Sequence, residues 1–63
     1  MKNNIEQMRK LKAITQEEMA RKLEISLSQY RNIEKDRCVT SVEIAIKIAK
    51  ILNKKVEDIF IPE

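Results

Sequence analysis

Few side chains in this 63-residue sequence could carry out covalent chemistry or hold a metal ion. Cys38 is the only Cys and there is no His, so the chain offers neither an intramolecular disulfide nor the ligands of a zinc or haem site. No acid–base or nucleophile–base pair is evident, and the absence of Gly excludes a Gly-rich phosphate-binding loop. We therefore expect no enzyme, no catalytic residue, no metal and no cofactor.

The most informative part of the sequence is residues 16–35. The apolar spacing there predicts a helix of about eight residues, a tight turn and a second helix, which is the spacing of a helix-turn-helix motif. Ala20 is small enough to let the two helices cross closely. The exposed face of the second helix holds Leu27, Ser28, Gln29, Arg31 and Asn32. Such a face suits recognition of a partner through hydrogen bonds.

Capping residues and apolar periodicity predict further helices around this motif. Three capping boxes begin at Thr15, Ser26 and Thr40, although Ser41 could serve as the third cap instead. The predicted helices run from Ile5 to about Lys12, from the Thr15 cap to about Leu23, from the Ser26 cap to about Lys35, from about Val42 to Leu52, and from about Lys55 to Phe60. The coarse prediction is an all-α chain.

Length and composition indicate one small domain spanning residues 1–63, with 43% apolar and 37% charged residues. The apolar runs are too short for a signal peptide or a membrane-spanning helix. Together with the unpaired thiol, this favours a cytoplasmic protein. The net charge of +3 is a weak indication of an anionic partner, and the basic residues are concentrated in residues 1–12 and 44–55.

A set of residues spread over nearly the whole chain matches one pattern of residue types and spacings. It comprises Met8-Arg9, Thr15–Ala20, Leu23 with Ile25-Ser26, Ile33-Glu34, Ser41-Val42, Ile48-Ala49-Lys50 with Leu52, and Val56–Phe60. In these residues the sequence resembles the Cro and phage-repressor type (XRE-like) of helix-turn-helix transcriptional regulators. The resemblance implies a compact five-helix bundle, a lambda-repressor-like domain with its helix-turn-helix at about residues 16–35. It also implies that the third helix enters the major groove of double-stranded operator DNA.

Carried over by position, the resemblance implies which side chains contact DNA. Those expected at base edges are Leu27, Ser28 and Asn32, with Gln29 and Arg31 nearby. Those expected at phosphates are Gln16, Lys35 and Arg37. Arg31 could take either role, since phosphate contacts position a protein and base contacts specify sequence. Leu27 could instead be an ordinary exposed apolar residue, and Gln29 could merely close its capping box.

The resemblance also indicates residues with structural roles. Arg9 and Glu34 match the family's ion pair between the first and third helices. The family usually has Gly or Pro where this chain has Glu24, Asp36, Asn53 and Thr40. A left-handed non-Gly residue costs about 1–2 kcal/mol, so we expect that Glu24→Gly stabilises the fold.

A single recognition helix contacts too few bases for selective binding, so a homodimer on an inverted repeat is expected. The residues expected in its interface are Ile51, Ile59, Phe60 and Ile61, with Ile46 as a further candidate. Ile59 and Phe60 could instead cap the core of one chain. The expected function is a repressor or small autoregulatory switch without a separate ligand-sensing domain.

Two other classes of function remain open. An antitoxin-like or adaptor module would bind a partner protein, with DNA binding secondary, and an exposed apolar groove without DNA affinity would favour it. A basic helix bundle on a membrane surface is suggested by Lys47, Lys50, Lys54 and Lys55. The chain lacks interfacial Trp and a detachable amphipathic helix, so we expect no membrane partner.

Overall fold

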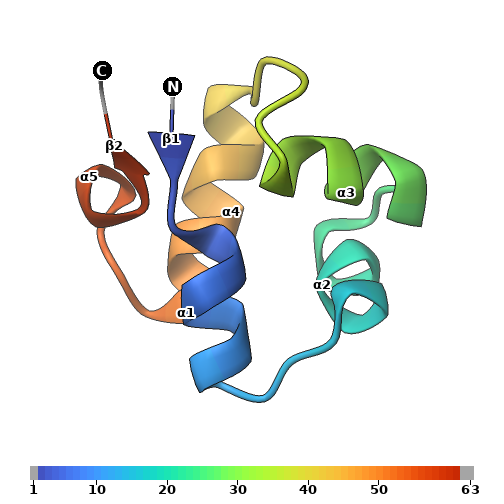
Figure 1. Ribbon diagram of the computed structural model, residues 1–63, viewed down its shortest axis with the longest axis horizontal. Helices are drawn as coiled ribbons and strands as arrows, with labels where there is room; N and C mark the ends of the chain where they lie inside the picture. The colour runs from blue at the N-terminus through green and yellow to red at the C-terminus, as the bar shows by residue number, and fades with distance from the viewer. Residues whose placement is uncertain (1, 62–63) are drawn as a thin grey trace.

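The computed structural model describes the backbone of residues 2–61 and the side chains of residues 3–60. Its elements are β1 (Lys2–Asn3), α1 (Ile5–Leu11), α2 (Gln16–Leu23), α3 (Leu27–Glu34), α4 (Val42–Leu52), α5 (Val56–Ile59) and β2 (Phe60–Ile61). Figure 1 shows α2 and α3 together on one side of the molecule, α1 and α4 in the middle, and α5 with the two strands on the other side. The five helices confirm the predicted helical bundle.

The two helices of the predicted motif begin at the expected caps. Thr15 Oγ1 accepts a hydrogen bond from the Glu18 N–H at 3.1 Å, and Glu18 Oε1 accepts one from the Thr15 N–H at 3.3 Å. This reciprocal pair is the capping box read from the sequence. Ser26 Oγ accepts from the Gln29 N–H at 3.1 Å, so α3 also has its expected cap.

Two other helix boundaries differ in detail from the expectation. The α4 cap is Ser41, whose Oγ accepts from the Ile44 N–H at 3.2 Å, so Ser41 and not Thr40 takes this role. The last helix ends at Ile59, one residue before the predicted end. Phe60 is extended, with φ −101° and ψ 112°, because it joins a strand pair.

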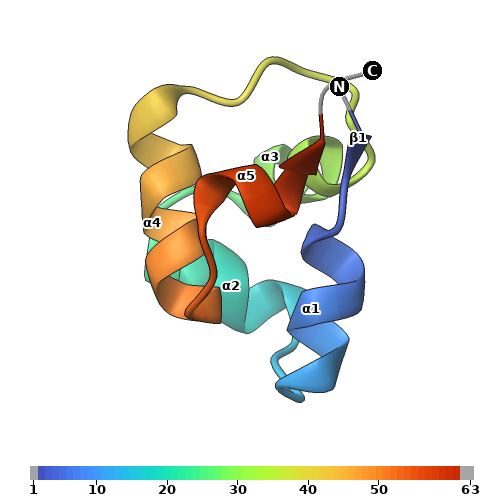
Figure 2. The ribbon, with the colours of Figure 1, turned by 90° about the vertical axis from the view of Figure 1, so that its left-hand side faces the viewer.

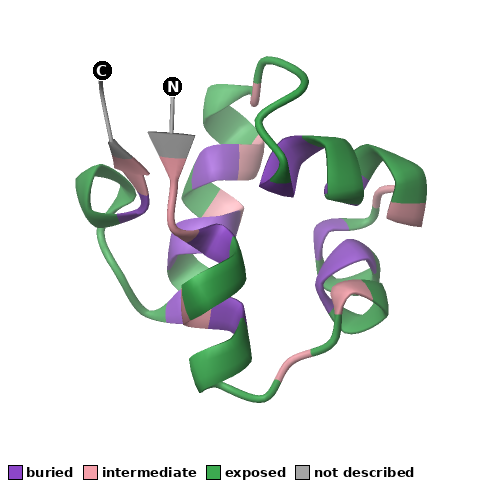
Figure 3. Ribbon diagram, in the orientation of Figure 1, coloured by how far each residue is buried: buried purple, intermediate pink, exposed green. Residues whose placement is uncertain are grey.

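Helix α4 supplies the centre of the hydrophobic core. Its inward side is formed by Ala45, Ile48, Ala49 and Leu52. The largest fully buried side chains of the described residues are Tyr30, Ile5, Met19, Leu23, Ile33, Ile48, Leu52 and Ile59. Figure 3 shows buried segments on α1, α2, α3 and α4. Ala20 on α2 is 4% exposed and lies in this core, which fits the close crossing expected of α2 and α3. Within the described residues, no helix is long and apolar enough to span a membrane.

Within residues 2–61, four turns place a non-Gly residue in the left-handed region. Glu24, Asp36 and Asn53, at three positions where the resemblance implies Gly, have φ of 59°, 57° and 56°, which confirms the left-handed conformation expected of Glu24. Ala13, with φ 56°, is a fourth such residue that sequence reasoning did not identify. It lies two residues after the end of α1, and the Ala13 N–H donates to the Lys10 carbonyl at 3.0 Å.

A two-residue antiparallel pairing ties the ends of the described chain together and was not predicted. Asn3 pairs with Phe60 and Lys2 with Ile61. The Asn4 N–H donates to the Ile59 carbonyl at 2.9 Å and extends the connection. Figures 1 and 2 both show β1 beside β2. Strands this short have no periodicity to read, and their partners lie far apart in sequence.

Candidate nucleic-acid interface

The turn between α2 and α3 fixes the orientation of α3. Glu24 closes α2 in the left-handed conformation, and the Ile25 N–H donates back to the Ala20 carbonyl at 3.1 Å. The Ile25 side chain packs against the core, and Ser26 then caps α3. Together with the buried side chains of both helices, this short connection holds α3 against the bundle along one face and leaves its other face open.

The open face of α3 carries the residues expected at base edges. Those that are exposed are Ser28, Gln29, Arg31 and Asn32. Leu27 is half-buried and packs against the core, so only part of its side chain is available to a partner. The opposite face of α3 is formed by Tyr30, Ile33 and Glu34, which are buried. The structure therefore brings the predicted contact residues together on one helix surface.

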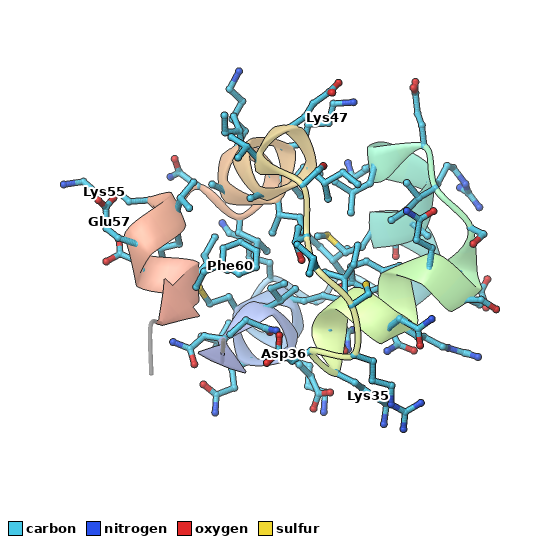
Figure 4. The ribbon with its side chains drawn as sticks, turned by 90° about the horizontal axis from the view of Figure 1, so that it is seen from above. Lys35, Asp36, Lys47, Lys55, Glu57 and Phe60 are labelled. Carbon is cyan, nitrogen blue, oxygen red and sulfur yellow. The ribbon has the colours of Figure 1, made fainter. Side chains whose placement is uncertain are left out.

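The residues expected at phosphates border this face. Gln16 is half-buried at the first position of α2, and Lys35 caps the end of α3 and is exposed. Arg37 is exposed in the following loop, where its N–H donates to the Asn32 carbonyl at 2.8 Å. Figure 4 shows Lys35 and Asp36 at the end of α3, on the opposite side of the molecule from Lys47. Gln16, Lys35 and Arg37 thus flank α3 at both ends of the motif.

A buried ion pair lies directly beneath this surface. Arg9 Nε donates to Glu34 Oε2 at 3.0 Å, and Arg9 Nη2 to Oε1 at 3.4 Å, as expected for the structural pair between α1 and α3. The Glu34 side chain is only 1% exposed. Arg9 Nη1 also donates to the Ile14 carbonyl at 2.8 Å, which connects α1 to the segment before α2. The pair therefore joins the first helix to both parts of the motif.

Two further side chains donate to the Glu34 carboxylate. The Tyr30 hydroxyl donates to Oε2, and Gln16 Nε2 donates to Oε1 at 3.1 Å. Burial by itself raises the pKa of Glu34, but the hydrogen bonds from Arg9, Tyr30 and Gln16 together hold that pKa below its ordinary value. Burial and the bond to the carboxylate raise the pKa of Tyr30. Glu34 is thus a carboxylate, and Tyr30 a neutral donor, at physiological pH.

Sequence reasoning missed part of this network. No polar partner was predicted for Tyr30, and Gln16 was assigned only a phosphate contact. The i, i+4 spacing of Tyr30 and Glu34 on one helix was a usable signal, since such residues face each other. The bond from Asn3 Nδ2 to the Ile33 carbonyl, 3.2 Å long, had no local signal because the two residues are 30 positions apart.

The chemistry available at this surface is hydrogen bonding and charge. Cys38 is a free, exposed thiol in the loop between α3 and α4. Among residues 2–61, no three His, Cys, Asp or Glu side chains are grouped so that they could hold a metal ion. Ser28, Gln29 and Asn32 offer hydroxyl and amide groups, and Arg31 offers a guanidinium, all of which match the donors and acceptors of nucleic acids.

The residues expected in a dimer interface differ in how far they are exposed. Ile59 has no exposed surface and belongs to the core, which is the alternative raised for it above. Ile51 and Phe60 are half-buried and pack against that core. The Ile61 side chain lies outside the described part of the structure. Ile46, the further candidate, is 43% exposed.

Exposed apolar side chains line a groove between the α3–α4 loop, α4 and α5. It has a volume of about 540 Å³, and we call it the apolar groove. Its apolar lining includes Val39, Val42, Ile46, Val56 and Phe60. Val39 and Val42 are 97% and 75% exposed. Figure 4 shows Phe60 between α4 and α5, at one side of this groove.

The short α2–α3 connection, the exposed polar face of α3 and the buried Arg9–Glu34 pair define a helix-turn-helix DNA-binding domain. The helix-turn-helix family model matches residues 5–59. The chain therefore belongs to the XRE-type helix-turn-helix family of DNA-binding transcriptional regulators, as its resemblance to Cro and phage repressors predicted.

Three archaeal proteins are similar to this chain over almost its full length. An uncharacterized HTH-type transcriptional regulator of Methanocaldococcus jannaschii is 44% identical over 63 residues, which cover 100% of this chain and 96% of that protein. Two uncharacterized HTH-type transcriptional regulators of Archaeoglobus fulgidus are 36% and 34% identical over 61 residues. These alignments cover 97% of this chain and 86% and 87% of those proteins.

Proposed function

We propose that this protein is a cytoplasmic repressor or autoregulatory switch that binds an inverted-repeat operator as a homodimer. The observation that carries the proposal is the exposed polar face of α3, held by the α2–α3 turn and by the buried network around Glu34. A rigid helix with such a face fits the major groove, where base edges present distinct donor and acceptor patterns.

The α3 side chains suit base recognition in different ways. Asn32 is exposed and offers an amide that can pair bidentately with adenine, and Gln29 offers the same group. Ser28 can donate or accept at several bases, and the exposed part of Leu27 can pack on a thymine methyl group. A good bidentate contact discriminates between bases by about 1–3 kcal/mol. We therefore assign sequence specificity mainly to Ser28 and Asn32.

The flanking residues would hold the protein on the DNA backbone. Lys35 and Arg37 are exposed after α3, and Gln16 begins α2, where free N–H groups favour a phosphate. Such contacts set register and orientation without reading sequence, and they make affinity depend on salt. Binding of an operator that overlaps a promoter is sufficient for repression.

The apolar groove supports a homodimer in which a second copy covers it. Val39, Val42 and Ile46 are more exposed than a monomer requires, and an isologous interface would remove them from water. The groove includes residues 36–40, which directly follow α3 and its cap. A second copy there lies near the end of α3, so that both recognition helices can approach one duplex. Ile51 and Phe60 would contribute only their exposed parts.

Selection of bound duplexes from a randomised DNA pool at about 150 mM salt tests this function, because nonspecific phosphate binding is weakened at that concentration. We expect enrichment of an inverted repeat whose half-sites are about one helical turn apart. The Asn32→Ala variant should lose the base preference at one position of the selected half-site. The Lys47→Ala variant, changed on the opposite side from the end of α3, should select the same sequence.

Absence of any enriched sequence from the wild-type selection would contradict this proposal. In that case the apolar groove favours the second candidate function, an antitoxin-like or adaptor module that binds a partner protein. A groove with large exposed apolar side chains can bury a partner's side chains as well as those of a second copy. The two functions are separated by whether sequence-specific DNA binding is found.

A further inference from the structure

A chain of side-chain hydrogen bonds runs from the buried Glu34 carboxylate to the surface of α3. Gln16 Nε2 donates to Glu34 Oε1 at 3.1 Å, and Arg31 Nε donates to Gln16 Oε1 at 3.3 Å. A carboxylate only accepts and a guanidinium only donates. The Gln16 amide therefore has one orientation that satisfies both neighbours, with its NH₂ group toward Glu34 and its oxygen toward Arg31.

This arrangement fixes Arg31 and leaves most of its donors free. The bond to Gln16 uses Nε, and Nη1 and Nη2 remain available at the end of the guanidinium. The side chains of Ser28, Gln29 and Asn32 make no hydrogen bond to another side chain among residues 3–60, where Gln29 donates only through its backbone N–H. Arg31 is thus the one residue on the exposed face of α3 that is tied to α2 by its side chain within the described chain.

The position of Arg31 around α3 also separates it from the base-reading residues. Successive residues of an α-helix are about 100° apart, so Ser28 and Asn32 lie within about 40° of each other. Arg31 lies about 60° from Ser28, on the flank that leads to Glu34 and α2. When the ridge of Ser28 and Asn32 faces the floor of a groove, this flank faces its wall, which is formed by phosphates.

We propose that Arg31 contacts a DNA phosphate through Nη1 and Nη2 and does not read a base, and that Gln16 is the residue that positions it. This rests on the proposed DNA-binding function and assigns one of the two roles open to Arg31. A guanidinium matches a phosphate with two parallel N–H donors, and holding it in place beforehand reduces the ordering needed on binding. Glu34 sets the orientation of the Gln16 amide.

The salt dependence of DNA binding tests the role of Arg31. Binding of wild type and of Arg31→Met is measured at several salt concentrations, on a duplex selected by the wild type and on an unselected duplex. We expect Arg31→Met to weaken binding by a similar factor on both duplexes and to lower the salt slope by about 0.9 per subunit. The sequence that it selects should be that of the wild type. A changed preference at one base position, or an unchanged slope, would overturn the assignment.

A neutral substitution tests the role of Gln16. Gln16→Met removes no charge, yet it should also lower the salt slope, because Arg31 loses its tether. The loss of affinity in the double variant should be smaller than the product of the two single losses, as expected for residues that act together. A wild-type slope for Gln16→Met, or fully independent effects, would overturn the positioning role.

Matched controls make these outcomes specific. Lys54→Met removes one positive charge from the exposed segment between α4 and α5, away from α3 in Figures 1 and 2, and should leave the slope unchanged. Circular dichroism and Tm establish that each variant is folded. Failure of the wild type to bind DNA would contradict the proposed function, whereas wild-type binding with no difference between Arg31→Met and Lys54→Met contradicts only this inference.

Discussion

At the scale of single residues, Glu34 organises the polar interior of this protein. Arg9, Tyr30 and Gln16 all donate to its carboxylate, and they come from α1, α3 and α2. In the part of the chain that the structure describes, no buried side-chain N or O atom lacks a hydrogen-bond partner. A domain of this size has an unfolding free energy of about 3–9 kcal/mol, and breaking a buried ion pair costs about 3–5 kcal/mol. Loss of either charge would therefore remove at least about a third of the unfolding free energy.

Tyr30→Phe gives a smaller and measurable perturbation of the same network. It keeps the ring in the core and removes only the hydroxyl donor, so we expect the unfolding free energy to fall by about 1.5–3 kcal/mol. Urea unfolding monitored by circular dichroism measures this change. Ser28→Ala removes an exposed hydroxyl from the same helix and should change stability by less than about 0.5 kcal/mol. Equal stability of Tyr30→Phe and wild type would show that the Tyr30 bond contributes nothing.

The lowered pKa of Glu34 makes stability depend on pH in the acidic range. Because its folded-state pKa lies below its ordinary value of 4.5, its contribution is complete above that pH and is lost as the pH falls through the folded-state pKa. Tyr30→Phe removes one of the bonds that lower the pKa. We therefore expect the variant to lose less unfolding free energy than wild type between about pH 6 and pH 2.5. An identical loss in urea titrations of both proteins would contradict this assignment.

At the scale of elements, the turns after the helices use non-Gly residues in the left-handed conformation, because the chain has no Gly. Ala13, Glu24, Asp36 and Asn53 all adopt the left-handed conformation. Asn tolerates this conformation better than other non-Gly residues, whereas the Cβ of Ala or Glu is strained in it. The surrounding hydrogen bonds, such as that from the Ile25 N–H to the Ala20 carbonyl, hold these turns in place. The strain in two of these turns can be relieved without altering any packed side chain.

Gly at the strained turns should stabilise the protein. Relief of about 1–2 kcal/mol of strain exceeds the free-energy cost of the greater entropy that Gly gives the unfolded chain. Ala13→Gly and Glu24→Gly should therefore each raise the unfolding free energy by about 0.5–1 kcal/mol. This corresponds to several degrees in Tm for a domain of this length. Asn53→Gly should have a smaller effect. An unchanged or lower Tm of both Ala13→Gly and Glu24→Gly would contradict the interpretation that these residues are strained.

At the scale of the whole molecule, the domain has two distinct surfaces. One is the polar face of α3, and the other is the apolar groove formed by the α3–α4 loop, α4 and α5. Between them the core is centred on α4, and the β1–β2 pairing closes the bundle by joining segments about 58 positions apart. Both surfaces therefore belong to one small domain with a shared core, so that an interface at the groove would fix the spacing of two α3 helices.

Val42→Glu should dissociate the proposed dimer without unfolding the monomer. Val42 is 75% exposed in the groove, and an acidic residue at the first position of α4 is favourable for the helix. In sedimentation at tens of micromolar, we expect a wild-type dimer and a Val42→Glu monomer that binds the inverted repeat more weakly. Leu11→Glu is the control, since Leu11 is 86% exposed outside the groove and the change in charge is the same. A monomeric wild type, or a dimeric Val42→Glu variant, would contradict this interface.

The sequence by itself determined the local features of this protein. Caps such as Thr15 and Ser41 act within three residues, and apolar spacing fixes the face of each helix, so helix positions were predictable. The resemblance to the helix-turn-helix family also implied the Arg9–Glu34 pair, and the family's usual Gly at the turn indicated Glu24 as a left-handed position. Ala13 gave no such signal, because neither its type nor its neighbours mark a left-handed turn.

Only the tertiary structure decided how distant segments meet. The β1–β2 pairing, the placement of Ile59 in the core and the apolar groove all depend on packing between elements that no local pattern specifies. The same holds for Gln16, which the resemblance assigned to a phosphate but which also joins Glu34 to Arg31 across two helices. Local hydrogen bonds and periodicity are encoded over a few residues, whereas these contacts exist only once the helices have taken their positions.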